Sequence, residues 1–424
     1  MSSSESSSPD VPEFPGLKGS TPPQDVTLVV RSRRAQPFFG RHPWVFTGAV
    51  DRIEGSVAEE IPPGSVVRLM SSENKFIAWG LYNHNSRILA RLYSWHEGER
   101  PDAELWQKLI RRAVELRRPL FDLSASTTGC RLVFSEADGL SGLTVDFYGG
   151  YLLVQFTSLA LFQYRDALLT ALRNEIKPRG IWLRTEKGMR EAEGLEVVDG
   201  LISGESPPRP LFIEENGISY GVDVQQGQKT GCYLDQRDNR LAASRYTKGA
   251  RVLDAYCFSG GFGITALKAG GAASVVGIDS SESALVMARA NAELNGIAQH
   301  CQWRRDDVRK AIDEMAGQGT VFDVVILDPP RMARTRSGAE RALNAYTQLN
   351  LQALRVLKPG GILVTCSCSG LVTKAEFQNV LGDVSRSSGR DIQILESRSQ
   401  PADHPVSVLC PETEYLKVLI CRVS

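Results

Sequence analysis

The C-terminal half of the sequence alternates regularly between apolar runs and amphipathic segments, and this alternation constrains the fold most strongly. The runs RVLDAY, SVVGID, DVVILD and ILVTCS lie within residues 251–367, and segments with helical spacing separate them, except where loops carry chemistry. Strands that alternate with helices form parallel sheets covered on both faces. We therefore predict a doubly wound α/β domain over residues 206–424.

One helix of this domain is bounded as well as periodic. Ser280 or Ser281 can cap the N-terminus of the segment SALVMARANAELN, because a hydroxyl accepts from the free amides of a first turn. Gly296 can take the left-handed conformation that ends a helix. The sequence therefore predicts a helix between these residues.

The N-terminal half has a different pattern. Residues 1–24 are rich in Ser and Pro and poor in large apolar residues, which predicts a disordered tail. Residues 25–100 contain short β-rich runs between Gly, Pro and Asn signals, which predicts a small β-barrel. Residues 101–118 have helical spacing. Strand-like runs (LVF, LTVDFY, YLLVQF, IWLRT, EVV) and a helix near 161–174 then predict a small α+β domain, so that 101–205 form a linker helix and middle domain.

Composition excludes several classes of protein. No secretion signal and no long apolar run is found, so we expect a cytoplasmic protein without a membrane partner. The eight cysteines form no CxxC pair, so we expect free thiols and no metal site. The chain has no net charge, but residues 31–118 hold 15 Lys and Arg against 10 Asp and Glu, a local excess of +5 that a solvated surface also explains.

Acidic residues stand near the ends of successive predicted strands. Asp254 ends the first, Asp279 the second and Asp328 the fourth, and Asp306 or Asp307 follows the third. Each alone could cap a helix. Together they lie at the edge of a parallel sheet where ligands bind, and Asp279 could accept hydrogen bonds from ribose hydroxyls. This order predicts a nucleotide-type cofactor, with its adenine near Asp306 or Asp307.

Glycines after the first strand narrow the choice of cofactor. Gly260, Gly261 and Gly263 precede a predicted helix and allow a ligand to approach the backbone closely. They do not match the GxGxxG pattern of dinucleotide enzymes. S-adenosylmethionine has no pyrophosphate, and Asp254 could favour its cationic amino-acid part.

The segment GGILVTCSCSG reads as a strand that leads into a loop with two cysteines, Cys366 and Cys368. Cys366 and Cys368 could be small core residues, but a thiol just past a strand end, flanked by Ser369 and Gly370, lies where a substrate can reach it. Methylation of cytosine at C5 requires such a thiol, since C5 becomes nucleophilic only after a thiolate adds to C6. Asp328 could stabilise this adduct by hydrogen bonding to the pyrimidine edge.

The acids and glycines resemble class I methyltransferases, whose motifs match Asp254 to Gly263, Asp279, Asp307 and Asp328 in order. More specifically, the chain from Val29 onward is similar to the large-subunit ribosomal RNA methyltransferase I family, PUA-domain enzymes that form 5-methylcytosine in bacterial 23S rRNA. The matching stretches are GRHPWVFTGAV, FSEADGLSGLTVDFY, GQKTGCYLDQR, FSGGFG, LDPPR, SCSG and ADHPV.

The resemblance implies S-adenosylmethionine as cofactor, 23S rRNA as partner and a Rossmann-like class I fold with YLKVLICRV as its antiparallel last strand. The cofactor residues that it implies are Asp254, Phe258, Gly260, Gly261, Gly263, Asp279, Asp307 and Asp328. It places the nucleophile at Cys368, and Cys366 is the second choice. Two positions depart from related enzymes. Pro330 stands where many RNA cytosine methyltransferases have a cysteine that helps release the product, and Arg331 replaces the family's usual lysine.

Several basic residues are candidates for contacts with RNA. In the PUA-like segment, Arg34 and Arg41 could bind phosphates, whereas Trp44 and Phe46 are interpreted as barrel core. By family position, GQKTGCYLDQRDNR approaches the cofactor or the base. Its candidates are Lys229, Asp235 and Arg237, and Arg331 is a further one.

Two other functions stay open from the sequence. The protein could methylate a base nitrogen without covalent catalysis, although DPPR lacks the aromatic residue of the NPPY motif. It could also be an inactive RNA-binding assembly factor, although the acids and the cysteine are intact. A homodimer is possible.

Overall fold

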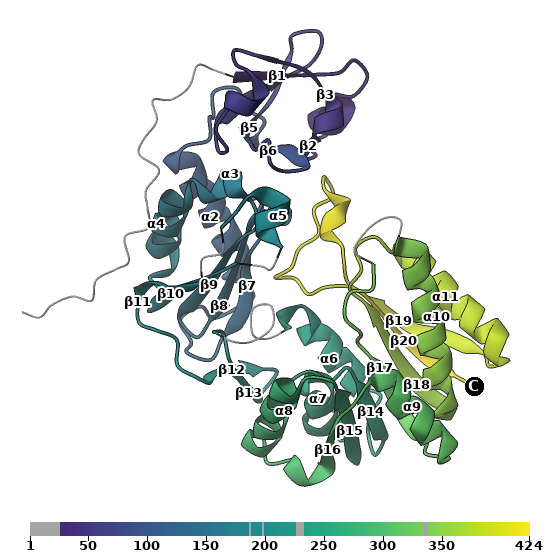
Figure 1. The fold of residues 1–424 in the computed structure, drawn as a ribbon. Coiled ribbons are helices and arrows are strands. Elements are labelled where there is room, and N and C mark those ends of the chain that lie inside the picture. The colour runs from purple at the N-terminus through teal and green to yellow at the C-terminus, as the bar shows by residue number, and fades with distance from the viewer. Residues whose placement is uncertain (1–25, 186–187, 197–198, 226–232, 334–337) are drawn as a thin grey trace, which may run out of the picture. The chain divides into compact units, whose positions relative to one another are not determined.

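The computed structural model describes residues 26–185, 188–196, 199–225, 233–333 and 338–424 (Figure 1). The chain forms two compact units. One contains the described residues of Met1–Pro119 and Leu132–Pro208, and the other those of Leu120–Arg131 and Arg209–Ser424. Within the described ranges, no helix combines the length and apolarity that are needed to cross a membrane.

The first unit begins with a mixed sheet whose strand order is β2-β6-β5-β4-β1-β3. Its strands are β1 (Val26–Val30), β2 (Trp44–Phe46), β3 (Val50–Glu54), β4 (Val66–Met70), β5 (Phe76–Tyr82) and β6 (Ile88–Ser94), with the short helix α1 (Gln36–Phe39). Alternating side chains such as Leu28, Val30, Val67 and Leu69 form a closed apolar core. The prediction of a β-rich domain in this region is confirmed.

A second sheet, which belongs to the same unit from Leu132 onward, has the order β11-β10-β9-β8-β7. It comprises β7 (Gly129–Phe134), β8 (Leu143–Tyr148), β9 (Tyr151–Phe156), β10 (Gly180–Arg184) and β11 (Gly200–Gly204), with helices α2 (Ala103–Arg117), α3 (Leu159–Phe162), α4 (Arg165–Ile176) and α5 (Met189–Glu193). Helix α2 starts where its sequence indicates, since Asp102 caps it by accepting from the Leu105 amide at 2.9 Å.

One detail of this middle region differs from the sequence-based expectation. The helix expected near residues 161–174 is two helices, because α3 ends and Tyr164 breaks the helical backbone before α4. Among the described residues, the strand that follows β10 is β11 at Gly200–Gly204, which pairs antiparallel with β10. Residues 197 and 198 of the predicted EVV strand lie outside the described ranges.

The second unit contains a hairpin and a large α/β sheet. The hairpin is β12 (Leu211–Glu215) with β13 (Ile218–Val222). The sheet has the order β16-β15-β14-β17-β18-β20-β19. Its strands are β14 (Arg251–Ala255), β15 (Ser274–Asp279), β16 (Cys301–Arg305), β17 (Phe322–Leu327), β18 (Leu357–Ser367), β19 (Ile392–Arg398) and β20 (Lys417–Val423). The helices are α6 (Arg237–Ser244), α7 (Gly261–Lys268), α8 (Glu282–Leu294), α9 (Val308–Gly317), α10 (Ala339–Arg355) and α11 (Lys374–Ser388).

Strands β14 to β18 are parallel, and β20 is antiparallel to both of its neighbours, as the C-terminal segment predicted. Helix α8 has its expected ends: Ser281 caps it, and Gly296 follows it at φ 69°. Separate apolar clusters cover the two sheet faces, one including Val325 and Leu349 and the other Val364 and Phe262. The prediction of a doubly wound α/β domain is confirmed.

Close packing around Trp303 aligns β15, β16 and the start of α7. A Cβ added at Gly277 would lie 2.3 Å from the Trp303 ring, and one added at Gly260 would lie 2.7 Å from it. We expect Gly277→Ala to lower the free energy of unfolding by about 1–3 kcal/mol, as overpacking does. Urea denaturation measures this. The control is Gly317→Ala, where the added Cβ meets no atom within 4 Å. An equal effect of both substitutions would contradict the packing argument.

Candidate active site

The carboxyl edge of the large sheet holds Asp254, which is fully buried on β14, an interior strand of the sheet. Its Oδ2 accepts a hydrogen bond of 2.8 Å from the Gly263 amide, whereas its Oδ1 is buried without a hydrogen-bond partner among the described residues. Burial, together with the nearby carboxylates of Asp328 and Asp279, raises the pKa of Asp254 to about 7. An unpaired buried oxygen is costly, so this atom is suited to bind a donor or a cation.

The loop from β14 to α7 has an unusual backbone. Tyr256 and Phe258 have positive φ angles of 64° and 48°, and Gly260 has 83° just before α7. Non-glycine residues seldom adopt such angles, and surrounding contacts must hold them there. The Phe258 amide donates to Asp279 Oδ2 at 3.0 Å, and its ring packs edge-on against Tyr233. This loop is therefore fixed above the sheet edge.

The next two strands place their acids differently. Asp279 ends β15, is partly exposed, and accepts from the amides of Phe258 and Ser281. Asp306 pairs with the Arg304 guanidinium. Asp307 is exposed, and its Oδ1 caps α9 by accepting from the Lys310 amide at 3.0 Å. The cap occupies that oxygen of Asp307 and orients the carboxylate.

The other side of the edge carries the cysteines. Cys366 is fully buried within β18, and burial raises its pKa well above the ordinary value, with Asp328 adding to the shift. Cys368 lies two residues later, beyond the strand end, and is partly exposed. Its thiol donates to the Pro329 carbonyl at 3.8 Å, beside Asp328. Of the two thiols, Cys368 is the accessible one.

Contacts through Ser369 join the two loops of this site. The buried Ser369 hydroxyl accepts from the amides of Met332 and Ala333 at 3.2 and 3.1 Å and lies 3.1 Å from the Tyr346 hydroxyl. The loop after β17, which carries Asp328, is thereby tied to the loop that carries Cys368.

Three features of the site were not expected from the sequence. Gln236, in the 3₁₀ turn Leu234–Gln236, donates to Asp328 Oδ1 at 3.0 Å. Tyr415 donates to Asp235 Oδ2 at 2.5 Å. Lys417 is buried at the start of β20. The sequence signals for these residues were the lysine inside the apolar run YLKVLICRV and the polar residues in YLDQR. Neither pattern predicts that Gln236 contacts a residue 92 positions away or that Asp235 contacts one 180 positions away.

The residues of the second unit that were predicted to contact RNA lie in different environments. Arg331 is exposed, and its Nε donates to the Ala333 carbonyl at 2.9 Å. Arg237 is 7% exposed, donates to the Gly129 carbonyl at 2.7 Å, and pairs with Asp403. These contacts enclose its guanidinium and give it a structural role. Lys229 lies outside the described residues.

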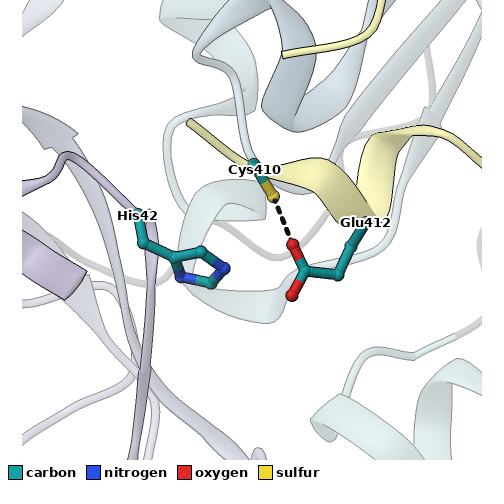
Figure 2. A group of neighbouring side chains, drawn as sticks. All are labelled: His42, Cys410 and Glu412. Carbon is teal, nitrogen blue, oxygen red and sulfur yellow. Dashed lines mark hydrogen bonds between the residues drawn. The ribbon is translucent and has the colours of Figure 1, made fainter. Parts of the chain in front are cut away.

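The segment ADHPV contributes to the buried contacts around Arg237 through Asp403. Asp403 accepts from the Arg131 amide at 2.9 Å and lies 3.1 Å from His404 Nδ1. Farther along the same loop, the Cys410 thiol donates to the Glu412 carboxylate at 3.5 Å (Figure 2). These local bonds hold the loop that precedes β20.

In the first unit, the basic segment is at the surface. Arg34 and Arg41 are exposed, and Arg41 has a φ of 64°. Trp44 is partly buried and donates through its indole nitrogen to Glu136 at 3.0 Å. Phe46 is 47% exposed, so the prediction that it belongs to the barrel core is wrong. Phe46 follows the buried Val45 in the three-residue strand β2, and successive side chains of a strand point to opposite faces, so Phe46 points away from the core.

Comparison with known families matches both parts of the chain. Residues 28–95 match the PUA-like domain family, and residues 140–410 match the family of S-adenosylmethionine-dependent methyltransferases. Among solved structures, a protein from Streptococcus mutans described as a SAM-dependent methyltransferase has a TM-score of 0.80 at 22% identity, over 93% of this chain and 99% of that one. A methyltransferase solved with SAH has a TM-score of 0.81 at 22% identity and the same coverage. These structures share the fold.

Curated relatives are more similar in sequence. Ribosomal RNA large subunit methyltransferase I of Aeromonas salmonicida is 41% identical over 94% of this chain and 99% of its own length. The enzyme of the same name from Escherichia coli O157:H7 is 39% identical over the same shares. The chain therefore belongs to the ribosomal RNA large subunit methyltransferase I family, with a PUA-like domain followed by an S-adenosylmethionine-dependent methyltransferase domain.

Proposed function

We propose that this protein forms 5-methylcytosine in 23S rRNA in the cytoplasm, through a covalent adduct with Cys368. The names of its relatives support large-subunit rRNA as the substrate. One observation carries the cytosine chemistry: the accessible Cys368 thiol lies beside the loop of Asp328, whereas Cys366 is enclosed in the core. A cytosine-C5 enzyme needs this combination of a reachable thiol and a polar group for the pyrimidine edge.

The residues of the sheet edge fit the cofactor. Bound S-adenosylmethionine supplies an electrophilic methyl group on a sulfonium. Asp254 offers its unpaired Oδ1 to the cationic amino-acid part, and Asp279 offers carboxylate oxygens to the ribose hydroxyls. Gly260, Gly261 and Gly263 at the start of α7 are further proposed cofactor contacts through their backbone. A Cβ at Gly260 or Gly263 would lie 2.7 Å from Trp303 or Val275, so these glycines also let the turn pack closely against the sheet. Phe258 and Asp307 complete this set of proposed cofactor contacts.

The chemistry then follows from Cys368 and Asp328. The Cys368 thiolate forms the Sγ–C6 bond, and the displaced electron pair makes C5 nucleophilic. Asp328 hydrogen-bonds the pyrimidine edge and stabilises the charge that develops there. C5 takes the methyl group as the bond from that group to sulfur breaks. A base removes the C5 proton, and the electron pair left on C5 expels Cys368 as a thiolate. Since Pro330 has no acid–base group, the base is another residue.

Trapping with 5-fluorocytosine tests this mechanism. Fluorine at C5 cannot leave as a proton does, so methylation of 23S rRNA that contains this base should stop at the adduct. We expect a protein–RNA complex that resists denaturing electrophoresis, forms only with S-adenosylmethionine, and is absent in Cys368→Ser. Normal methylation of unmodified RNA without any trapping would reject covalent catalysis and favour methylation of a base nitrogen. Absence of cofactor binding by calorimetry would favour an inactive assembly factor.

Cofactor binding should depend on pH through Asp254. Its pKa of about 7 means that the carboxyl is mostly protonated at pH 6, and the cationic cofactor favours the ionised form. From pH 6 to 7.5 the ionised fraction rises about eightfold, so the dissociation constant should fall about eightfold. Asp254→Asn should bind more weakly and lose this dependence in calorimetry. The control is Asp323→Asn. Asp323 lies near the start of β17, away from the carboxyl edge of the sheet, so this variant should keep the pH dependence of cofactor binding. A pH-independent wild type would contradict the assignment.

RNA binding by the PUA-like domain should depend on its exposed arginines. The double substitution Arg34→Ala and Arg41→Ala should reduce the slope of log K against log salt concentration by about 1.5, since each phosphate contact contributes about 0.7–0.9. Filter binding to an rRNA fragment at several salt concentrations measures this. Arg52→Ala is the control, because Arg52 already pairs with Glu54 at 2.8 Å. Equal slopes for the wild type, the double variant and the control would show that these arginines do not contact the RNA phosphates.

A further inference from the structure

A lysine lies next to the loop that carries Cys368. Lys417 starts β20 and pairs in register with Ser367, the last residue of β18. Its Nζ donates to the Ser369 carbonyl at 2.6 Å and to the Tyr415 carbonyl at 2.9 Å. The ammonium is therefore held beside the residue that follows Cys368.

Burial of this ammonium needs an electrostatic reason. Lys417 is 3% exposed, and removing a cation from water is unfavourable unless other groups compensate the charge. Its two bonds go to neutral carbonyls, and in the described part of the chain no carboxylate forms an ion pair with it. The Cys368 thiol is the acidic group with the largest electrostatic effect on Lys417. An anion at Cys368 would compensate the buried charge.

We propose that Lys417 is a positioning residue that stabilises the Cys368 thiolate, through its charge and through its bond to the Ser369 carbonyl. This inference rests on the proposed function, because it concerns the nucleophile of that reaction. The thiol proton leaves to solvent, and the nearby ammonium stabilises the negative charge that remains on Sγ.

The pH range of this effect follows from the groups around the pair. These are Asp328 and Arg331 after β17, Tyr346 of α10, Cys366 of β18, Glu376 of α11, Asp235 of the 3₁₀ turn, and Glu414 and Tyr415 before β20. Burial lowers the pKa of Lys417 to about 8, although Cys368 and Glu414 act against this shift. The ammonium is present below that pH and is lost above it. Its stabilisation of the thiolate is therefore greatest near and below pH 7.5.

Alkylation of Cys368 tests the inference without RNA or cofactor. The full chain is treated with iodoacetamide from pH 5.5 to 9.5, and mass spectrometry measures the rate for the Cys368 peptide. We expect a wild-type midpoint below the ordinary thiol value of about 8.5. Lys417→Met should raise the midpoint by about one unit and slow alkylation at pH 7 by about tenfold, and Lys417→Arg should restore most of the rate.

Two further variants separate charge from structure. Lys417→Gln keeps a hydrogen-bond donor for the carbonyls but removes the charge, so it should raise the alkylation midpoint as much as Lys417→Met does. If Lys417→Met does not fold, Lys417→Gln tests the role of the charge in its place. Lys358→Met, which removes an exposed lysine paired with Asp323 at the other end of β18, should leave the midpoint in place. A rate that changes equally at every pH, with a fixed midpoint, would show a structural role and overturn the inference.

The outcome is distinguishable from failure of the proposed function. A shifted midpoint without 5-fluorocytosine trapping would support the Lys417–Cys368 coupling and reject the covalent mechanism. Trapping with an unshifted midpoint in both neutral variants would reject the role of Lys417 alone.

Discussion

Replacement of Cys368 by alanine is expected to lower kcat for cytosine methylation by about 10⁴-fold or more, because the C5 carbon then has no means of becoming nucleophilic. The dissociation constant for S-adenosylmethionine should change by less than about twofold, since none of the proposed cofactor residues lies on β18 or in the loop after it that carries Cys368. Single-turnover transfer of a labelled methyl group and calorimetry measure the two quantities.

Cys366→Ala is the matched comparison. Cys366 packs in the core with Val364 and Val418, so its loss should reduce stability by about 1 kcal/mol and leave covalent trapping in place. If Cys366→Ala abolished trapping in a folded protein while Cys368→Ala retained it, the assignment of the nucleophile would have to be reversed.

Asp328→Asn should lower kcat by about 10²–10³-fold, because an amide cannot supply the charge or the proton exchange of a carboxyl group at the pyrimidine edge. The asparagine oxygen can still accept from Gln236, which donates to Asp328 at 3.0 Å, so the local structure should persist. Rapid-quench methylation assays measure the change in kcat.

Asp323→Asn tests whether any aspartate of this strand would give the same result. Asp323 lies at the other end of β17 and pairs with Lys358 at 2.8 Å. Its substitution should change kcat by less than about twofold. A loss below about threefold in Asp328→Asn would show that Asp328 does not act in the chemical step.

Local sequence was enough to predict much of the fold, because the relevant signals are short-range. The caps of α2 and α8 depend on Asp102, Ser281 and Gly296, each within four residues of the backbone groups that it contacts or of the helix end that it follows. The order of acids along the chain also predicted their common edge, since the carboxyl ends of neighbouring parallel strands coincide.

Short-range signals failed where backbone geometry decided the outcome. Tyr164 interrupts a segment whose apolar spacing predicts one helix. Phe46 is apolar and was assigned to the core, but it follows the buried Val45 in β2 and is exposed on the other face. Apolar content alone records neither a break in a helix nor which face of a short strand is covered.

The sequence by itself determined the α/β alternation and the acids near the strand ends, and the family resemblance indicated Cys368 before Cys366. Only the tertiary structure decided how each group is surrounded. Arg237 is enclosed by Asp403 and Gly129, and Lys417 is held against Ser369, the residue after Cys368, by a strand that returns antiparallel about 50 residues later. The physical reason is that burial and electrostatic coupling depend on distances through space, and the sheet brings together side chains that are far apart along the chain.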